Sequence, residues 1–203
     1  MTMAKAFRGF VRFFKRVRNR LSSYYNLLRL NLYGVEHGRH CVIHGKLYIT
    51  LFPTASVKIG NNLYFSSGWG INALSTNRRG MIYATENARI VIGNHVGMSS
   101  TVLWAHKQIT IGDHVKIGGN CTLIDTDSHN KDFLVRRGQY TDWGESAPIT
   151  IEDDVFIGMN CIILKGVTIG ARSIIAAGSV VTKNIPSDCI AGGNPAKVIR
   201  TLS

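Results

Sequence analysis

The chain has 203 residues, of which 45% are hydrophobic and 18% are charged, a balance that fits one soluble globular domain with a sizeable core. No stretch approaches the roughly 18 to 20 consecutive apolar residues that a membrane-spanning helix needs, and arginines interrupt any signal-peptide core near the start. The four cysteines form no C-x-x-C pair, so we expect neither a disulfide framework nor a zinc site. These features predict a cytoplasmic protein.

Residues 1–35 are predicted to form a basic amphipathic helix. Residues 1–40 hold nine Lys or Arg against one acid, Glu36. The apolar residues recur at steps of three and four, as on one helix face: Phe7, Phe10, Val11, Phe14, Val17, Leu21, Tyr24, Tyr25, Leu28 and Leu32. This face either docks on the domain or caps an open sheet end, or it lies on an anionic membrane surface. A mitochondrial presequence is a third alternative. The segment lacks any recognised nucleic-acid-binding module, so no nucleic acid is expected as a partner.

Four residues follow where this helix is expected to end: Glu36, His37, His40 and His44. Their spacing suits a metal site, but no ligand set is completed. We therefore expect a capping network here and no metal.

A six-residue period dominates the second half of the chain. Aliphatic residues stand at every sixth position: Ile151, Ile157, Ile163, Ile169, Ile175 and Val181. Mostly small residues follow four positions after each, and the same spacing appears at Ile111, Ile117 and Leu123. Hexapeptide repetition is typical of a parallel β-helix, in which stacked coils bury one continuous core. We expect an all-β domain over residues 36–190.

The segment from Pro148 to Arg200 is similar to the left-handed β-helix acyltransferases of the hexapeptide-repeat superfamily, above all to their maltose, galactoside and polysaccharide O-acetyltransferase branch. The similarity is strong over about residues 90–200, weaker over 40–90, and absent from the first 35 or so. The resemblance implies a left-handed coil and a homotrimer with acetyl-coenzyme A bound between neighbouring prisms.

The repeat breaks at "CTLIDTDSHNKD", residues 121–132. Asp127 stands where a small residue belongs, and the next sound repeat begins at Ile151, so an inserted loop is expected over 130–148. In the family, a histidine after an Asp-containing stretch at the start of such a loop is the general base, and His129 takes that place. An imidazole, with its ordinary pKa near about 6.5, is mostly neutral and able to accept a proton at cellular pH. Asp125 or Asp127 is expected to orient its ring.

Two later segments, "GSVVTKNIP" and "GNPAKVIR", resemble the coenzyme A segments of the family. The resemblance assigns cofactor contacts to Ala177, Gly178, Thr182, Lys183 and Arg200. Lysine and arginine complement phosphates, while small residues leave room for the pantetheine arm. Residues 191–203 are expected to form a coenzyme A-binding tail.

The acceptor side departs from the family. Galactoside and maltose enzymes hold the sugar with an Asn and an Asp, whereas this chain has Met98 and His106 at about those places, which argues against simple sugars. The inserted loop is rich in aromatic and charged residues, which either line an acceptor site or pack between subunits. The candidate acceptor-binding residues are Asp127, His106, Trp143 and Tyr140.

The resemblance predicts an O-acetyltransferase that moves acetyl from acetyl-coenzyme A to a hydroxyl of a glycan, such as a cell-surface polysaccharide or its precursor. An antibiotic or small-molecule acetyltransferase is the alternative enzyme, and a β-helix scaffold or binding module is the alternative outside enzymes. The expected location is the cytoplasm, with the inner face of the membrane as an alternative reached through residues 1–35.

Overall fold

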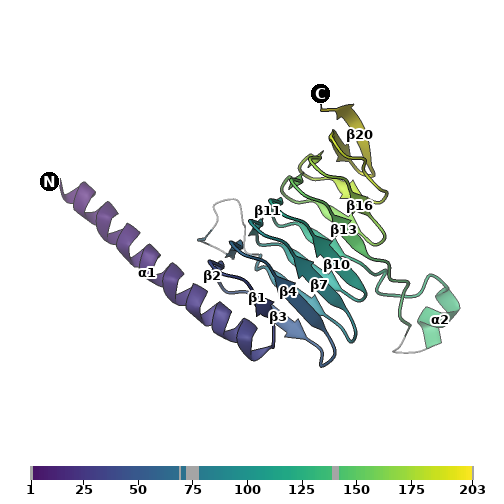
Figure 1. Cartoon of the computed structure of the whole chain (residues 1–203), viewed down its shortest axis with the longest axis horizontal. Helices are drawn as coiled ribbons and strands as arrows, with labels where there is room; N and C mark the ends of the chain where they lie inside the picture. Colours follow the sequence, from purple (N-terminus) through teal and green to yellow (C-terminus); the bar gives the residue numbers. More distant parts are fainter. Residues whose placement is uncertain (1, 69, 72–77, 139–141, 203) are drawn as a thin grey trace.

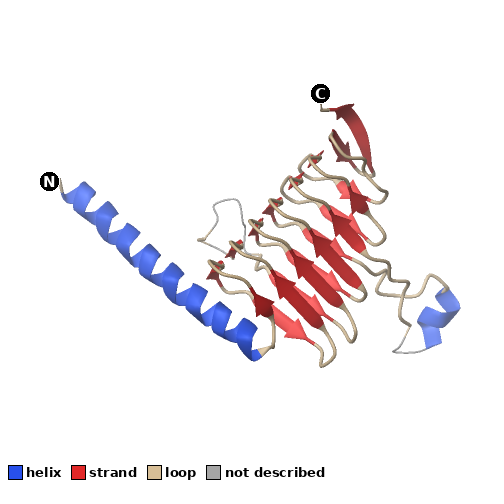
Figure 2. Cartoon of the chain, in the orientation of Figure 1, coloured by secondary structure: helices blue, strands red, loops and turns tan. Residues whose placement is uncertain are grey.

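The computed structural model describes residues 2–68, 70–71, 78–138 and 142–202. A long helix, α1 (Met3–Leu32), is followed by a stack of short strands, with one short helix, α2 (Phe133–Gly138), in a loop (Figures 1 and 2). None of the described helices is long and apolar enough to cross a membrane.

The strands form three sheets that make the sides of a prism. Sheet A contains β1 (Glu36–His37), β4 (Ser56–Ile59), β7 (Arg89–Ile92), β10 (Gln108–Ile111), β13 (Ile149–Ile151) and β16 (Thr168–Ile169). Sheet B contains β2 (Val42–Gly45), β5 (Tyr64–Ser67), β8 (Gly97–Ser99), β11 (Lys116–Gly119), β14 (Phe156–Ile157), β17 (Ile174–Ile175), β19 (Cys189–Gly193) and β20 (Ala196–Thr201). Sheet C contains β3 (Tyr48–Leu51), β6 (Met81–Ala84), β9 (Val102–Ala105), β12 (Thr122–Ile124), β15 (Ile162–Leu164) and β18 (Val180–Val181).

Successive strands belong to successive sheets, so the chain winds through A, B and C in turn and each circuit adds one coil. Strands of neighbouring coils pair in parallel, and at the C-terminal end β20 turns back to pair antiparallel with β19. The predicted parallel β-helix is confirmed.

The six-residue period corresponds to columns of stacked core residues. Ile111, Ile151 and Ile169 are partners in adjacent strands of sheet A, and each is almost completely buried. The same register joins Ile117, Ile157 and Ile175 in sheet B, and Leu123, Ile163 and Val181 in sheet C. The small residues between them, including Cys121 and Cys161, are also buried. Each repeat thus supplies one layer of a continuous core.

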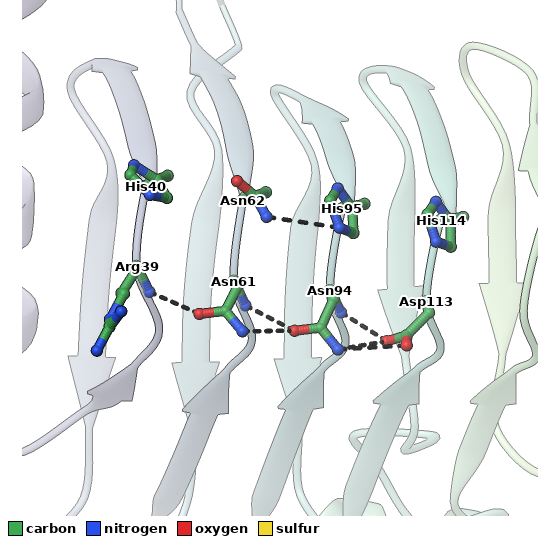
Figure 3. Close-up of a pocket in the computed structure, with 8 residues that line it drawn as sticks. All are labelled: Arg39, His40, Asn61, Asn62, Asn94, His95, Asp113 and His114. Carbon is green, nitrogen blue, oxygen red and sulfur yellow. Dashed lines mark hydrogen bonds between the residues drawn. The ribbon is translucent and has the colours of Figure 1, made fainter.

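The corner between sheets A and B is held by a ladder of polar side chains (Figure 3). The Asn61 N–H donates to Asn94 Oδ1 at 2.9 Å, and the Asn94 N–H donates to Asp113 Oδ1 at 2.6 Å. These bonds satisfy backbone donors of one coil with a side chain of the next, and the bonds that Asn94 donates lower the pKa of Asp113. His95 and His114 adopt positive φ beside this ladder, and their rings stack at 4.7 Å. We therefore assign these asparagine, aspartate and histidine residues a structural role at the corner.

The acid and histidines after α1 do not converge. Glu36 pairs with Lys58 on β4 at 3.0 Å, and His44 Nδ1 lies 3.4 Å from the Tyr64 hydroxyl. Among the described residues, no group of three His, Cys, Asp or Glu side chains is placed to hold a metal ion.

Helix α1 docks on the first coil through polar side chains and through Leu30, which is fully buried in the core. The amide of Asn26 donates to the carbonyls of Ile43 and Gly45 at 3.1 and 2.6 Å, and Ser23 Oγ accepts from the Ile43 N–H at 3.1 Å. Ser22 Oγ accepts from the Gly45 N–H in the same way. The helix thus covers the open end of sheet B, as one of the alternatives predicted, but the apolar residues of the predicted face remain exposed, and Leu30 is the fully buried apolar residue of α1. Strand β2 is an edge strand with backbone groups to satisfy, and polar side chains satisfy them.

Candidate active site

The loop between β12 and β13 leaves the prism on a two-stranded stem. Antiparallel bridges join Thr126 to Ser146 and His129 to Trp143. The Asn130 N–H donates to the carbonyl of Asp142 at 2.7 Å. A Cβ at position 144 would collide with the His129 carbonyl, so glycine at this position allows the two stem strands to approach. The stem fixes the backbone of His129 although the residue lies outside the core.

The imidazole of His129 is held by Asp142. Nδ1 lies 3.1 and 3.2 Å from the two carboxylate oxygens. The His129 side chain is 71% exposed, whereas Asp142 is only 12% exposed. A carboxylate that accepts from Nδ1–H leaves the lone pair of Nε2 on the open side of the ring. This arrangement suits a general base with an orienting acid.

The expectation that Asp125 or Asp127 orients the ring is wrong. Asp125 is completely buried, and its carboxylate accepts from the backbone N–H groups of His106, Lys107 and Gln108 at 2.6, 2.8 and 2.7 Å. It therefore shapes the corner beneath the loop. Three charge-assisted bonds to backbone donors make Asp125 a structural residue.

Asp127 belongs to an ionic clasp that also contains Glu145, Lys131 and Lys165. Lys131 Nζ lies 2.7 Å from Glu145 and 3.5 Å from Asp127, and Lys165 Nζ lies 3.1 and 3.3 Å from the same two acids. The two lysines lower the pKa of Glu145 to about 2. Lys165 follows β15, so the clasp fastens the stem to the next coil of the prism.

Aromatic side chains form a row beside His129. The rings of Trp143 and His106 are 5.3 Å apart, those of His106 and Trp104 6.5 Å, and those of Trp104 and Tyr83 4.9 Å. Burial lowers the pKa of His106, and the charge of Asp125 opposes that shift. Two predicted acceptor residues, His106 and Trp143, thus lie together next to the candidate base, while Tyr140 lies outside the described residues.

The predicted coenzyme A residues occupy different edges of sheet C. Thr182 and Lys183 follow β18 at the corner that leads to sheet A, the same corner from which the His129 loop leaves. Ala177 and Gly178 lie between β17 and β18 at the opposite corner, where Gly178 has a φ of 75°. Gly178 and Thr182 are four positions apart, so an extended chain separates the two corners by about 13 Å. One protomer therefore does not gather His129 and Ala177 into one site.

Arg200 lies apart from both corners. It is exposed on β20 opposite Ile190 of β19, in the antiparallel pair at the C-terminal end of the prism.

A groove of about 660 Å³ covers the outer face of sheet C on the other side of Trp104. Its lining residues are Tyr48, Arg78, Arg79, Met81, Val102, Trp104, Thr122 and Ile124. Arg79 donates to the Tyr48 hydroxyl at 2.8 Å, and Arg78 donates to Thr122 Oγ1 at 3.1 Å. The described lining contains two guanidinium groups and no acid.

Sequence reasoning missed Asp142 and the two arginines of the groove. Asp142 is thirteen positions from His129, and only the pairing of the two stem strands brings them together. The one signal in the sequence was the length of the inserted loop, because the two ends of a long loop must meet where it leaves the prism. Arg78 and Arg79 lie in the region of weak family resemblance, where no motif marked them.

A family model described as "Hexapeptide repeat of succinyl-transferase" matches residues 148–183. A putative acetyltransferase of Schizosaccharomyces pombe is 49% identical over 94 residues, 46% of this chain and 44% of that protein. A galactoside O-acetyltransferase of Lactococcus lactis is 32% identical over 170 residues, 83% of this chain and 63% of that enzyme. The chain thus spans less than two thirds of these curated relatives.

A solved structure covers nearly the whole chain. The hexapeptide-repeat acetyltransferase of Vibrio cholerae complexed with acetyl-coenzyme A is 30% identical, with a TM-score of 0.57, and the match covers 98% of this chain and 88% of that one. Together with the three-sheet prism, these matches identify the fold as a left-handed β-helix. The chain belongs to the hexapeptide-repeat acetyltransferase superfamily.

Proposed function

We propose that the protein transfers acetyl from acetyl-coenzyme A to a hydroxyl of a glycan, such as a cell-surface polysaccharide or its precursor, with His129 as general base. The observation that carries this proposal is the His129–Asp142 pair on a fixed, exposed stem. Membership of the acetyltransferase superfamily supports the reaction class.

The proposed step is direct transfer. Nε2 of His129 accepts the proton of the acceptor hydroxyl as its oxygen attacks the thioester carbonyl. The C–S bond then breaks, the new ester forms, and the imidazolium returns its proton to the leaving thiolate as coenzyme A. Asp142 accepts from Nδ1–H throughout, which orients the ring and stabilises the imidazolium.

We further propose that coenzyme A binds between protomers of a homotrimer, where Ala177 and Gly178 of one copy face His129, Thr182 and Lys183 of another. The support is the placement of these two sets on opposite edges of sheet C. Arg200 is proposed to pair with a cofactor phosphate.

The proposed acceptor site is the row formed by Trp143, His106 and Trp104, with the groove beyond it. Aromatic faces bind apolar surfaces and leave polar edges free for hydroxyl groups. Arg78 and Arg79 favour an acceptor that carries a carboxylate or phosphate. The proposed location is the cytoplasm, where acetyl-coenzyme A is available, with α1 as the contact to the membrane.

The test is a product-mass screen in which acetyl-coenzyme A and candidate acceptors are incubated with the wild type and with His129→Ala. An acetylated glycan formed only by the wild type supports the proposal. Acetylation of small antibiotics alone would support the alternative enzyme. Binding of coenzyme A without any transfer would leave a binding module and overturn the proposed reaction.

A mixing experiment tests the shared site. His129→Ala removes the base, and Ala177→Trp fills the proposed pantetheine path, so each variant alone is expected to be inactive. In randomly mixed trimers, about one site in four combines an intact His129 from one copy with an intact Ala177 from its neighbour. Co-expressed variants should therefore recover about a quarter of the activity. A site contained in one protomer would give no recovery.

A further inference from the structure

Helix α1 has two parts that differ in what they contact. Residues 22–30 lie against β2 through the hydrogen bonds of Ser22, Ser23 and Asn26. The only buried residues of the described helix are Ser23, Asn26 and Leu30. Figure 1 shows α1 crossing the N-terminal end of the prism, with the chain's N-terminus well away from the strands. Arg18 also donates to the carbonyl of Gly70 at 3.1 Å, so the free part of the helix is the half that precedes Arg18.

The helix carries a continuous apolar stripe, defined here as Phe7, Phe10, Phe14, Val17, Leu21 and Leu28, which runs the length of the free part and continues along the outer side of the docked part. Phe7 is 68% exposed and Leu21 is 65% exposed. Phe10 and Phe14 are in contact, with ring centroids 4.4 Å apart. With about 3.6 residues per turn, the stripe falls on roughly the opposite side of the helix from Ser22 and Asn26. It therefore faces away from the prism, and an exposed patch of this kind marks an interaction surface.

The charge of the same segment is uniformly positive. Lysine and arginine occupy positions 5, 8, 12, 15, 16, 18 and 20, and residues 1–35 contain no Asp or Glu. Among the described residues, no ion pair includes a side chain of α1. The helix thus combines an unpartnered apolar stripe with unneutralised positive charge.

We propose that α1 binds the surface of an anionic bilayer, with the apolar stripe in the headgroup and acyl boundary and the basic residues against lipid phosphates. A basic polar face opposite an aromatic-rich apolar face is the pattern of helices that lie in the membrane plane. A second copy of the helix would meet like charges along the same segment, and this repulsion disfavours self-association as the occupant.

The docked end sets the orientation of the protein on the membrane. Because the stripe faces away from the prism, the proposed membrane surface lies beyond the N-terminal end of the prism. His129 follows β12 and is therefore several coils away from that surface. If the protein forms the trimer proposed above, parallel prisms present three stripes at one end, and binding gains from multivalency. Surface binding itself does not depend on the trimer or on acetyl transfer.

The experiment is cosedimentation of the full chain with vesicles of phosphatidylcholine, with and without added phosphatidylglycerol, at low and high salt. Phe10→Ser/Phe14→Ser tests the stripe, and Arg12→Gln/Arg16→Gln tests the charge. The matched controls are Phe52→Ser/Phe156→Ser and Arg89→Gln/Lys116→Gln, which make equal changes at exposed positions of the prism. Thermal unfolding verifies that each variant remains folded.

The wild type is expected to bind the anionic vesicles at low salt and to be released by high salt. Loss of two basic residues should weaken binding about 30-fold, since each contributes about 1 kcal/mol near the surface. The stripe variant should lose binding, and both controls should keep it. Failure of the wild type to bind at low salt, or equal losses in the controls, would overturn the proposal. So would a stripe variant that changes only the oligomeric state in sedimentation velocity.

Discussion

Helix α1 and the prism are both amphipathic by sequence, but the structure uses their apolar residues in opposite ways. In the prism, the aliphatic residue of each hexapeptide is buried in a column with its neighbours. In α1, the residues that recur at steps of three and four are exposed, and polar side chains and Leu30 on another face make the contact with the first coil. Periodicity therefore tells which residues share a face, but not what covers that face.

The physical reason lies in the first coil. The end of the prism core takes up one side chain of α1 completely, that of Leu30, and Leu27 packs against it. Strand β2 still has carbonyl and N–H groups to pair at Ile43 and Gly45, and Ser22, Ser23 and Asn26 pair with them. Buried backbone groups without hydrogen-bond partners raise the free energy of the folded state. The exposed apolar stripe of α1 carries no such penalty, and another surface can still cover it.

The largest effect is expected when the proposed catalytic base is removed from the prism while α1 is left unchanged. His129→Ala should lower kcat by about 10² to 10⁴-fold, roughly 3 to 5 kcal/mol of transition-state stabilisation, with coenzyme A affinity and melting temperature unchanged. His114→Ala, at an exposed prism corner, is the control and should keep full activity. A His129 variant that keeps most of its kcat would remove this residue as the base.

Deletion of residues 2–17 is the counterpart in α1. It removes most of the stripe and keeps Ser22, Ser23 and Asn26, so the first coil remains capped. Transfer to a soluble acceptor should stay within about twofold of the wild type, because the fraying end of the helix contacts none of the site residues. Loss of all transfer in a truncated protein that still folds would contradict the separation of the two regions.

Substitutions of apolar residues should cost much more stability in the prism core than in the exposed stripe of α1. Ile163→Ala deletes fully buried methyl groups from sheet C and should reduce the free energy of unfolding by about 2 to 5 kcal/mol. Leu28→Ala in the exposed stripe should change it by less than about 0.5 kcal/mol. Urea denaturation monitored by circular dichroism measures both. A comparable loss at Leu28 would mean that the stripe is buried in solution.

The repeating part of the fold could be predicted from the sequence, because a six-residue period places Ile151, Ile157 and Ile163 on successive sides of one coil, where all three share a common core. It also placed His129 at the root of a loop, since the repeat count fails there. It could not identify Asp142 as the partner, because that contact depends on how a non-repeating loop folds back. Likewise, no periodicity distinguishes a docked apolar face from an exposed one.

Docking by the polar face makes its own prediction. Asn26→Ala removes two hydrogen bonds and leaves the carbonyls of Ile43 and Gly45 without these donors, which should cost about 1 to 3 kcal/mol. The measurable result is faster proteolysis within α1 and little change in the unfolding of the prism. Leu21→Ser, on the exposed stripe, should leave the proteolysis rate unchanged. Equal sensitivity at both positions would show that α1 does not rest on the face described.

The loop between β12 and β13 is a third case, because it has neither a column of buried aliphatic residues nor a helix face docked on the prism. Ion pairs between charged side chains attach it to the next coil. Lys131 and Lys165 lower the pKa of Glu145 from about 4.5 to about 2. A carboxyl whose pKa is depressed in the folded state stabilises it above the unfolded pKa, and this contribution is lost as pH falls towards the folded pKa. The clasp should therefore weaken between about pH 4.5 and pH 2.

The effect should be small and local, because Glu145 is fully exposed and surface ion pairs are screened by solvent. Pepsin cleavage near Phe133 in α2, compared with that of Glu145→Gln at each pH, measures it. The variant should be cut faster near pH 4.5, and the two rates should converge as pH approaches 2, while Glu86→Gln, an exposed acid elsewhere on the prism, follows the wild type. Rates that differ by the same factor throughout would mean that the clasp acts by packing and not by charge.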